Sequence, residues 1–267
     1  MHAITTALAL TLAALTNLAF TIPGLAQDRL EHCPGLVASG RPLIQRAALA
    51  AGEVALTFIG HSTFLIESPG GVRIATDYND YVRPAVVPEV ATMNRAHSTH
   101  YSEFPDPGIK HVLRGWNPAG GPARHDLTVG DVQIRNVATN IRDWGGRTSY
   151  DGNSIFVFET GGLCVAHLGH LHHPLEPGHL KALGRIDVVL VPVDGNWTLD
   201  LDGMMEVLAT LNAPLMVPMH YFGPTTLNRF LDRARARFDV ATSEAASVTL
   251  TRAGLPPRPK VLVLPGR

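Results

Sequence analysis

The stretch VALTFIGHSTFLIESPGGVRIATD, residues 54–77, contains three short apolar runs separated by turn residues. The runs VALTFIG, TFLIES and VRIATD are rich in β-branched and aromatic residues, which are typical of β-strands. A Pro-Gly-Gly turn joins the last two runs. His61 and Asp77 stand where two of the runs end. The segment therefore predicts three consecutive strands with polar side chains at strand ends.

Beyond this stretch the chain continues with strand-like runs and then alternates between strands and helices. The strand-like runs occupy residues 126–139, 153–169, 185–193 and 213–223. Helical spacing of apolar residues appears at residues 177–184, 200–212 and 225–238. The run RIDVVLVPV is apolar throughout, as expected for a strand buried on both faces. This order predicts one α/β domain over residues 53–267, with sheets inside and helices outside.

The composition narrows the functional classes. Of the 267 residues, 45% are hydrophobic and 17% are charged, and the formal net charge is −1. A chain of this length can bury a sizeable core. It contains no basic patch interleaved with aromatic residues, so nucleic acid is not an expected partner. Its 13 histidines are more than the packing of a fold usually needs. Because histidine often serves in catalysis and metal binding, we expect a small-molecule substrate.

The first 26 residues differ from the rest of the chain. An apolar run at residues 3–20 is followed by small residues at Gly24 and Ala26. This pattern predicts a signal peptide over residues 1–26, an N-terminal arm over residues 27–52, and a periplasmic or secreted protein. The alternative is an uncleaved membrane anchor, because the run is nearly long enough to span a bilayer. Cleavage would leave no stable membrane insertion.

Two cysteines follow the predicted cleavage point. Cys33 lies in the arm and Cys164 lies in GGLCVAHLG. In an oxidising compartment the two could form a disulfide that ties the arm to the domain. The alternative is that Cys164 is a small buried apolar residue and Cys33 is free.

Histidines gather just after the predicted strands, where loops of α/β folds carry chemistry. The polar residues at these strand ends are His61, Asp77, His97, His100, His167, His170, His172, His173 and His220. One histidine at a strand end is usually a packing residue. Several converging strand ends with imidazoles indicate a metal site, because neutral imidazole is a common ligand for zinc and related ions.

These residues resemble the metallo-β-lactamase-fold hydrolases, with the closest likeness to the ascorbate 6-phosphate lactonase-like and phospholipase D-like enzymes. The matching stretches are TFIGHSTFLIES, GGVRIATD, NRAHSTH, GNSIFVFETGGLCVAHLG, IDVVLVPVDG and PLMVPMHYFG, in the family's order. Together they cover nearly all of residues 54–238. The resemblance implies an αββα sandwich of two mixed β-sheets flanked by helices, with a metal site along one edge of the sheets.

The family's main ligand loop, His-x-His-x-Asp-His, falls on residues 95–100 of this chain. His97 and His100 match two of its ligands. Arg95 replaces the first histidine and Thr99 replaces the aspartate. An arginine cannot ligate a metal because it stays protonated. It would instead repel a second cation or bind an anionic substrate group, so the resemblance implies that a two-metal centre is lost.

The remaining ligand positions of the family also differ in this chain. Its next histidine would fall near Asn140 and Asp143, where this chain has none. Its bridging aspartate falls on His170, and its last histidine matches His220. The altered set still predicts a site for one ion, with zinc expected and manganese or iron as alternatives. The expected ligands are His97, His100, His170 and His220.

Other residues receive supporting roles. His170 or Asp143 is the expected base, and Arg95 the expected contact for substrate. Positions next to the ligands are expected for His61, Asp77, Thr99 and Asn140. Simpler interpretations remain for several of these: His61 as a packing residue, Asp77 as a turn residue, and HLGHLHH as a surface cluster that binds metal adventitiously.

The leading functional prediction is an exported metal-dependent hydrolase that uses a metal-activated water on an ester, lactone or phosphodiester. The alternative is a catalytically degenerate protein that binds a metal or small ligand on the same fold. A weaker third interpretation is a nitrogen-rich site that holds iron or manganese for redox chemistry. Whether a metal is bound, and how many ions, discriminates among the three.

Overall fold

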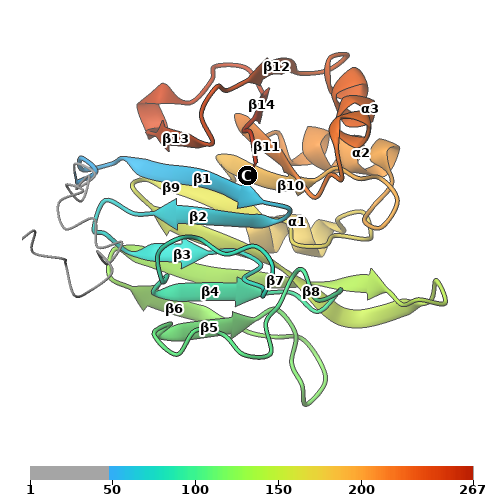
Figure 1. Ribbon diagram of the computed structural model, residues 1–267. Coiled ribbons are helices and arrows are strands. Elements are labelled where there is room, and N and C mark those ends of the chain that lie inside the picture. Colours follow the sequence, from blue (N-terminus) through green and yellow to red (C-terminus); the bar gives the residue numbers. More distant parts are fainter. Residues whose placement is uncertain (1–47, 267) are drawn as a thin grey trace, which may run out of the picture. The chain divides into compact units, whose positions relative to one another are not determined.

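The three runs at residues 54–77 form consecutive antiparallel strands. They are β1 (Val54–Gly60), β2 (Thr63–Glu67) and β3 (Arg73–Ala75). The structure, a computed structural model, describes residues 48–266. In it these strands belong to a six-stranded sheet of order β13-β1-β2-β3-β4-β5 (Figure 1). The other members are β4 (Val90–Met93), β5 (His111–Arg114) and β13 (Ser247–Leu250).

A second sheet has eight strands in the order β12-β14-β11-β10-β9-β8-β7-β6. From β12 to β9 neighbouring strands are parallel, and from β9 to β6 they are antiparallel. Gly161 and Gly162 form the tight β8–β9 turn, and both have positive φ angles. The strands are β6 (Asp126–Val129), β7 (Val132–Arg142), β8 (Thr148–Thr160), β9 (Leu163–His167), β10 (Val188–Pro192), β11 (Leu215–Met219), β12 (Asp239–Thr242) and β14 (Lys260–Val263).

The two sheets pack against each other through a shared apolar core. Inward-facing residues of both sheets, such as Phe64 and Ile74 on one side and Phe156 and Leu190 on the other, belong to one buried cluster. Strand β10 is buried along its whole length, as its uninterrupted apolar sequence predicted. The sandwich therefore holds the strand ends of both sheets in fixed positions.

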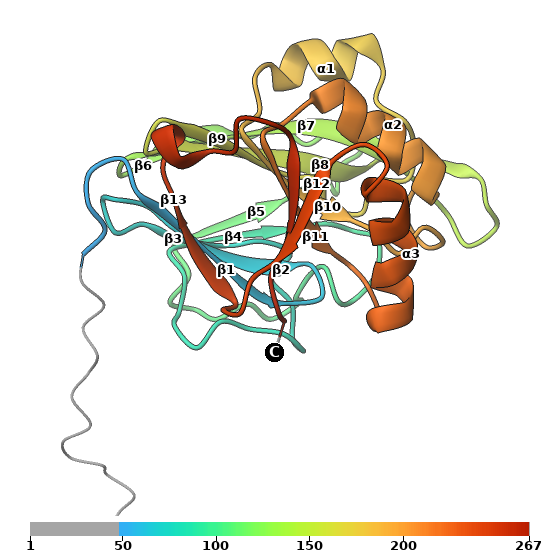
Figure 2. The same ribbon diagram turned by 90° about the horizontal axis from the view of Figure 1, so that it is seen from above.

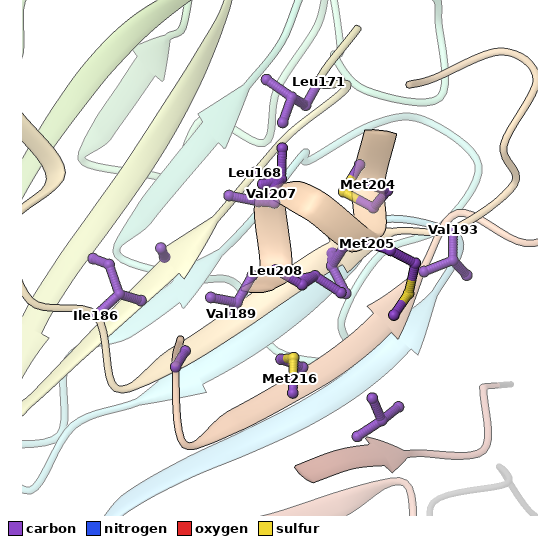
Figure 3. Close-up of a cluster of buried hydrophobic side chains, with 14 of the residues drawn as sticks. Leu168, Leu171, Ile186, Val189, Val193, Met204, Met205, Val207, Leu208 and Met216 are labelled. Atoms are coloured by element: carbon purple, nitrogen blue, oxygen red, sulfur yellow. The ribbon is translucent and has the colours of Figure 1, made fainter. Parts of the chain in front are cut away.

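Helices cover the outer face of the eight-stranded sheet (Figure 2). They are α1 (Pro177–Leu183), α2 (Leu201–Leu211) and α3 (Pro224–Ala234). Helix α2 begins where the Asp200 carboxylate accepts a hydrogen bond from Gly203 N, and it ends at Asn212, which has a left-handed backbone. Its apolar face packs on the sheet through residues that include Met204, Val207 and Leu208 (Figure 3).

The outer face of the six-stranded sheet is covered differently. Ala75 and Met93 on this face pack against loop residues Tyr78, Ile109 and Trp116. Among the described residues, all three α-helices lie on the larger sheet. The predicted fold class of two mixed sheets with flanking helices is confirmed, and loops supply the cover on the second side.

Several elements were not predicted from the sequence. The short strands β5, β12, β13 and β14 lie in segments without a clear alternating pattern, and β13 extends the first sheet by pairing antiparallel with β1. The predicted signal peptide, most of the predicted arm, and Cys33 lie outside the described residues. Cys164 is buried, with its Sγ 3.4 Å from Arg185 Nη2. No helix of the described part is long and apolar enough to cross a membrane.

The packing of α2 predicts a large effect of a single substitution. Leu208 is 1% exposed in the cluster under the helices, so Leu208→Ala should lower the free energy of unfolding by about 2–5 kcal/mol. Thr210→Ala, on the exposed face of the same helix, should change it by less than about 0.5 kcal/mol. Chemical denaturation measures both. Equal effects of the two substitutions would contradict the assigned packing of α2.

Candidate metal centre

Several of the chain's histidines meet where strands of both sheets end. Strands β1, β3 and β4 run in one direction in the first sheet, and β9, β10 and β11 are parallel in the second. The backbone N–H of His220 donates to the carbonyl oxygen of His61 at 2.7 Å, which joins the two edges. The polar residues that follow these strands are His61, Asp77, His97, His100, His170, Asp194 and His220.

The four predicted ligands lie together. The ring centroids of His97, His100, His170 and His220 are 4.5–5.6 Å from one another. His61 lies beside them, 4.3 Å from the His220 ring. His170 is 2% exposed and lies within this cluster, so the interpretation of HLGHLHH as a surface cluster is wrong for this residue.

Two of these histidines are each held by a buried carboxylate. His100 Nδ1 lies 2.5 Å from Asp77 Oδ2, and Asn94 Nδ2 donates to the other oxygen of Asp77 at 3.0 Å. His220 Nδ1 lies 3.0 Å from Asp194 Oδ1, which also accepts from the Thr198 hydroxyl at 2.5 Å. A carboxylate on one ring nitrogen makes that nitrogen the donor and leaves the other with its lone pair.

The opposite nitrogens of these two rings have no partner. Among the described residues, Nε2 of His100 and Nε2 of His220 are buried and make no hydrogen bond. An unsatisfied buried polar atom is costly and rare in proteins. Two of them on facing imidazoles, each fixed by a carboxylate behind it, fit the arrangement of histidine ligands around a metal ion.

A chain of hydrogen bonds sets the tautomers of the other histidines. It starts at the backbone N–H of Arg142, which donates to His172 Nδ1 at 2.8 Å. Because Nδ1 accepts, neutral His172 carries its proton on Nε2, and this N–H donates to His170 Nδ1. By the same logic His170 carries its proton on Nε2, which lies 3.0 Å from His97 Nε2.

The same chain continues to His97 and His61. His97 accepts at Nε2 and therefore donates from Nδ1 to the Thr99 hydroxyl at 2.8 Å. The Thr99 hydroxyl in turn donates to His61 Nε2 at 2.9 Å. His97, like His100 and His220, thus presents an Nε2 lone pair toward the cluster. His170 presents an N–H there, which disfavours the role of metal ligand that the sequence predicted for it.

Burial lowers the pKa of His100, His170 and His97, which favours the neutral imidazoles that metal ligation requires. A positive charge on His220 would lower the pKa of His100 and His97 further. Burial lowers the pKa of His172 to about 3, with the Arg142 charge adding to the effect. For Asp194, burial would raise the pKa, but the hydrogen bonds from His220, the Thr198 hydroxyl and the backbone of Asn196 contribute to an opposing effect that outweighs it, and the pKa falls.

Backbone strain is concentrated at the same place. His61, Asp77 and His220 have φ angles of 51°, 42° and 55°, in the left-handed region that non-glycine residues seldom adopt. Such a conformation costs about 1–2 kcal/mol per residue. Gly169, at φ 61°, precedes His170 where a Cβ would lie 2.3 Å from Asn153 Oδ1. Strained residues that cluster in this way are typical of functional sites.

A four-histidine set that includes His61 is also possible by distance alone. His61, His97, His100 and His220 can each offer one nitrogen within 4.8 Å of the others. Nε2 of His61 accepts from the Thr99 hydroxyl and Nε2 of His97 accepts from His170, so an ion bound by either ring through Nε2 would replace that hydrogen bond. His61 and Thr99 lie beside the ligands, and Asp77 contacts one directly, in the positions that the sequence predicted.

Three other predicted site residues lie apart from the histidines. Asp143 is in the β7–β8 turn, where backbone hydrogen bonds from Arg147 and Gly145 lower its pKa and Arg147 Nε lies 3.1 Å away. Asn140 Oδ1 accepts from the backbone of Asp151. Among described contacts neither touches the cluster, so the geometry gives no support to Asp143 as base. The Arg95 side chain is exposed on the ligand loop, without a described partner.

Two residues of the site, Asp194 and His172, were not assigned a role from the sequence. Asp194 follows the buried strand β10, and a carboxylate just after such a run was the signal that could have identified it. His172 was noted among the strand-end residues but received no role. Its importance comes from the backbone N–H of Arg142, a partner 30 positions away that no local pattern reveals.

Comparisons with known proteins agree with this geometry. Residues 55–220 match the family model of the beta-lactamase superfamily domain. A protein of Thermoplasma volcanium named as a metal-dependent hydrolase is 31% identical over 32% of this chain, a match that spans only 37% of that relative. One from Methanoculleus marisnigri, with the same description, is 25% identical over 70% of this chain and 90% of its own length.

A solved structure is also similar. The Thermotoga maritima protein described as a putative zinc-dependent hydrolase of the metallo-beta-lactamase superfamily has 29% sequence identity. The match has a TM-score of 0.59 and covers 80% of this chain and all of that one. The fold, the ordered histidines and the family model agree. The chain belongs to the metallo-β-lactamase superfamily.

Proposed function

We propose that this protein is a metal-dependent hydrolase with one ion held by the Nε2 atoms of His97, His100 and His220. The observation that carries the proposal is the pair of buried, unpartnered Nε2 atoms on His100 and His220, each backed by a carboxylate. His97 supplies the third lone pair, on the Nε2 atom that accepts from the N–H of His170.

Three neutral imidazoles are a donor set suited to a catalytic zinc ion. Catalytic zinc sites keep three protein ligands and one open position, whereas structural sites close all four. A bound ion would polarise a carbonyl or phosphoryl oxygen and lower the pKa of water. A second ion has little to bind to, because Asp77 and Asp194 are occupied by Nδ1 atoms and Thr99 and Arg95 stand at two of the family's ligand positions.

In this proposal His170 acts on the substrate and not on the metal. Its ring is 4.7 Å from those of His100 and His220, and His172 keeps its proton on Nε2. When His97 Nε2 ligates the ion, the N–H of His170 loses that acceptor and is free to donate to a substrate oxygen. A donor placed where negative charge develops stabilises the transition state of acyl or phosphoryl transfer.

The substrate is proposed to be an ester, lactone or phosphodiester, preferably with an anionic group. The exposed Arg95 guanidinium shares a loop with two of the three ligands and has no described carboxylate partner. It is therefore available to bind an anionic group of the substrate bidentately. The predicted signal peptide supports export, and a periplasmic or secreted location remains part of the proposal.

The ligand assignment predicts a specific pattern of metal content. Wild-type protein purified without an affinity His-tag should hold about one transition metal ion per chain. His97→Ala, His100→Ala and His220→Ala should each lose most of it and melt at lower temperature, because metal bound to the native state stabilises that state. His170→Ala and His61→Ala serve as matched controls and should retain it.

Elemental analysis of the six proteins measures this pattern. Two firmly held ions in wild type would contradict the one-metal site. Loss of metal in His170→Ala as severe as in His100→Ala would make His170 a ligand after all.

The catalytic proposal predicts metal-dependent turnover within a panel of phosphodiester, lactone and carboxylic ester substrates. His170→Ala should lower kcat about 100-fold or more with metal content unchanged, as for loss of an oxyanion donor. Arg95→Ala should raise KM for anionic substrates only. Arg229→Ala removes another exposed arginine, on α3, whose side chain has no partner among the described residues, and should have no effect. Absence of turnover in a metal-loaded protein would favour the degenerate metal-binding protein.

A further inference from the structure

Three large aromatic side chains are exposed on loops around the metal centre. Trp144, Trp197 and Phe222 have 86%, 50% and 61% of their surface exposed. Aromatic residues carry large apolar area, and a cluster of them exposed on a soluble protein marks a binding surface more often than single scattered residues do. We call these three residues the aromatic rim.

Two members of the rim, Trp197 and Phe222, each lie within three residues of a site residue. The backbone N–H of Trp197 donates to Asp194 Oδ2 at 2.5 Å, the carboxylate that holds His220. The Phe222 ring is 5.4 Å from the His220 ring and 5.8 Å from the His61 ring. The rim is therefore tied to the metal centre by short local connections.

Trp144 reaches the rim from a different part of the fold. It lies at the tip of the β7–β8 hairpin, which extends beyond the body of the larger sheet (Figure 1). Two residues earlier, Arg142 Nη2 donates to the carbonyls of Asn196 and Thr198, and so ties the hairpin to the Trp197 loop. The Arg142 backbone also holds His172, so one residue connects this part of the rim to the catalytic histidines.

The two tryptophans form an edge-to-face pair. Their ring centroids are 6.0 Å apart and their planes meet at 76°. Both residues remain half or more exposed, so apolar ring surface is left for contact with a partner. Edge-to-face and offset-stacked contacts favour an aromatic partner over an alkyl chain of equal area, and a rigid ring loses less conformational entropy when it binds.

We infer that the aromatic rim binds an aromatic ring of the substrate, which makes the substrate class an aryl- or arylmethyl-bearing ester, lactone or phosphodiester. This inference rests on the proposed function for the position of the scissile bond. The rim holds the ring while the bond next to it lies at His97, His100 and His220, with His170 facing the reacting oxygen. Binding energy from such a remote group positions the substrate for reaction.

The test compares three inert phosphonates that differ in one group: methylphosphonate, hexylphosphonate and 1-naphthylmethylphosphonate. Binding to full-length protein is measured by calorimetry, and for the naphthyl compound also by quenching of tryptophan fluorescence, with and without one equivalent of zinc. The variants are Trp144→Leu and Trp197→Leu, which keep apolar bulk and remove the rings. Tyr150→Leu is the matched control, because Tyr150 is 77% exposed on the same hairpin and has no described ring contact.

The naphthyl compound should bind about tenfold or more tightly than the other two, and each tryptophan variant should remove most of that advantage while Tyr150→Leu keeps it. Equal binding of the hexyl and naphthyl compounds overturns the aromatic preference. If the naphthyl compound keeps its advantage in both tryptophan variants, or if no compound binds, the aromatic rim is not a binding site for an aromatic ring. Zinc dependence of methylphosphonate binding reports on the metal centre separately, so its loss alone counts against the proposed function and leaves the naphthyl comparison valid.

Discussion

The hydrogen bond from the Arg142 backbone to His172 constrains the tautomers of three neighbouring site histidines, His172, His170 and His97. A backbone N–H can only donate, so His172 Nδ1 must accept, and every proton along the chain through His170, His97 and Thr99 is then assigned. As a consequence, neighbouring imidazoles carry their protons on different ring nitrogens. Three of them, His97, His100 and His220, present an Nε2 lone pair toward the cluster, and His170 presents an N–H. This bond and the two carboxylates behind His100 and His220 together decide which ring nitrogens carry lone pairs.

The sandwich makes this arrangement possible. The ligand loop after β4 and the strand ends of β9 and β11 come from different sheets, and the apolar core between the sheets fixes their separation. The buried carboxylates Asp77 and Asp194 orient one histidine each. Their hydrogen bonds offset the free-energy cost of burying a carboxylate. The left-handed backbone at His61, Asp77 and His220 is strain that the surrounding packing sustains.

Much of the fold and part of the site could be predicted from the sequence. The apolar runs at residues 54–77 and the buried run at β10 carry strong periodic signals, and the helices at α1, α2 and α3 appear within a few residues of their expected bounds. His97, His100, His170 and His220 were predicted to converge, and they do. Short edge strands such as β13 depend on tertiary pairing and have no comparable local signal.

What the sequence could not provide was the role of each histidine. Family likeness placed His170 at a ligand position, whereas its tautomer depends on a contact to His172 and, through it, on Arg142. Asp143 was chosen as a base for its place in the sequence, but its turn holds it with Arg147. The direction of a hydrogen bond and the position of the β7–β8 hairpin are properties of the folded chain, which no local sequence pattern reveals. The resemblance predicted which histidines converge, and their hydrogen bonds distinguish their proton positions.

The most direct measurement of the central claim is the tautomer of each site histidine, obtained from long-range ¹H–¹⁵N correlation spectra of the zinc-loaded protein with single-histidine variants for assignment. The account predicts that His170 and His172 carry their protons on Nε2. It predicts that His97, His100 and His220 carry theirs on Nδ1, with Nε2 shifted by the metal. A His170 that is protonated on Nδ1 and metal-shifted on Nε2 would contradict it.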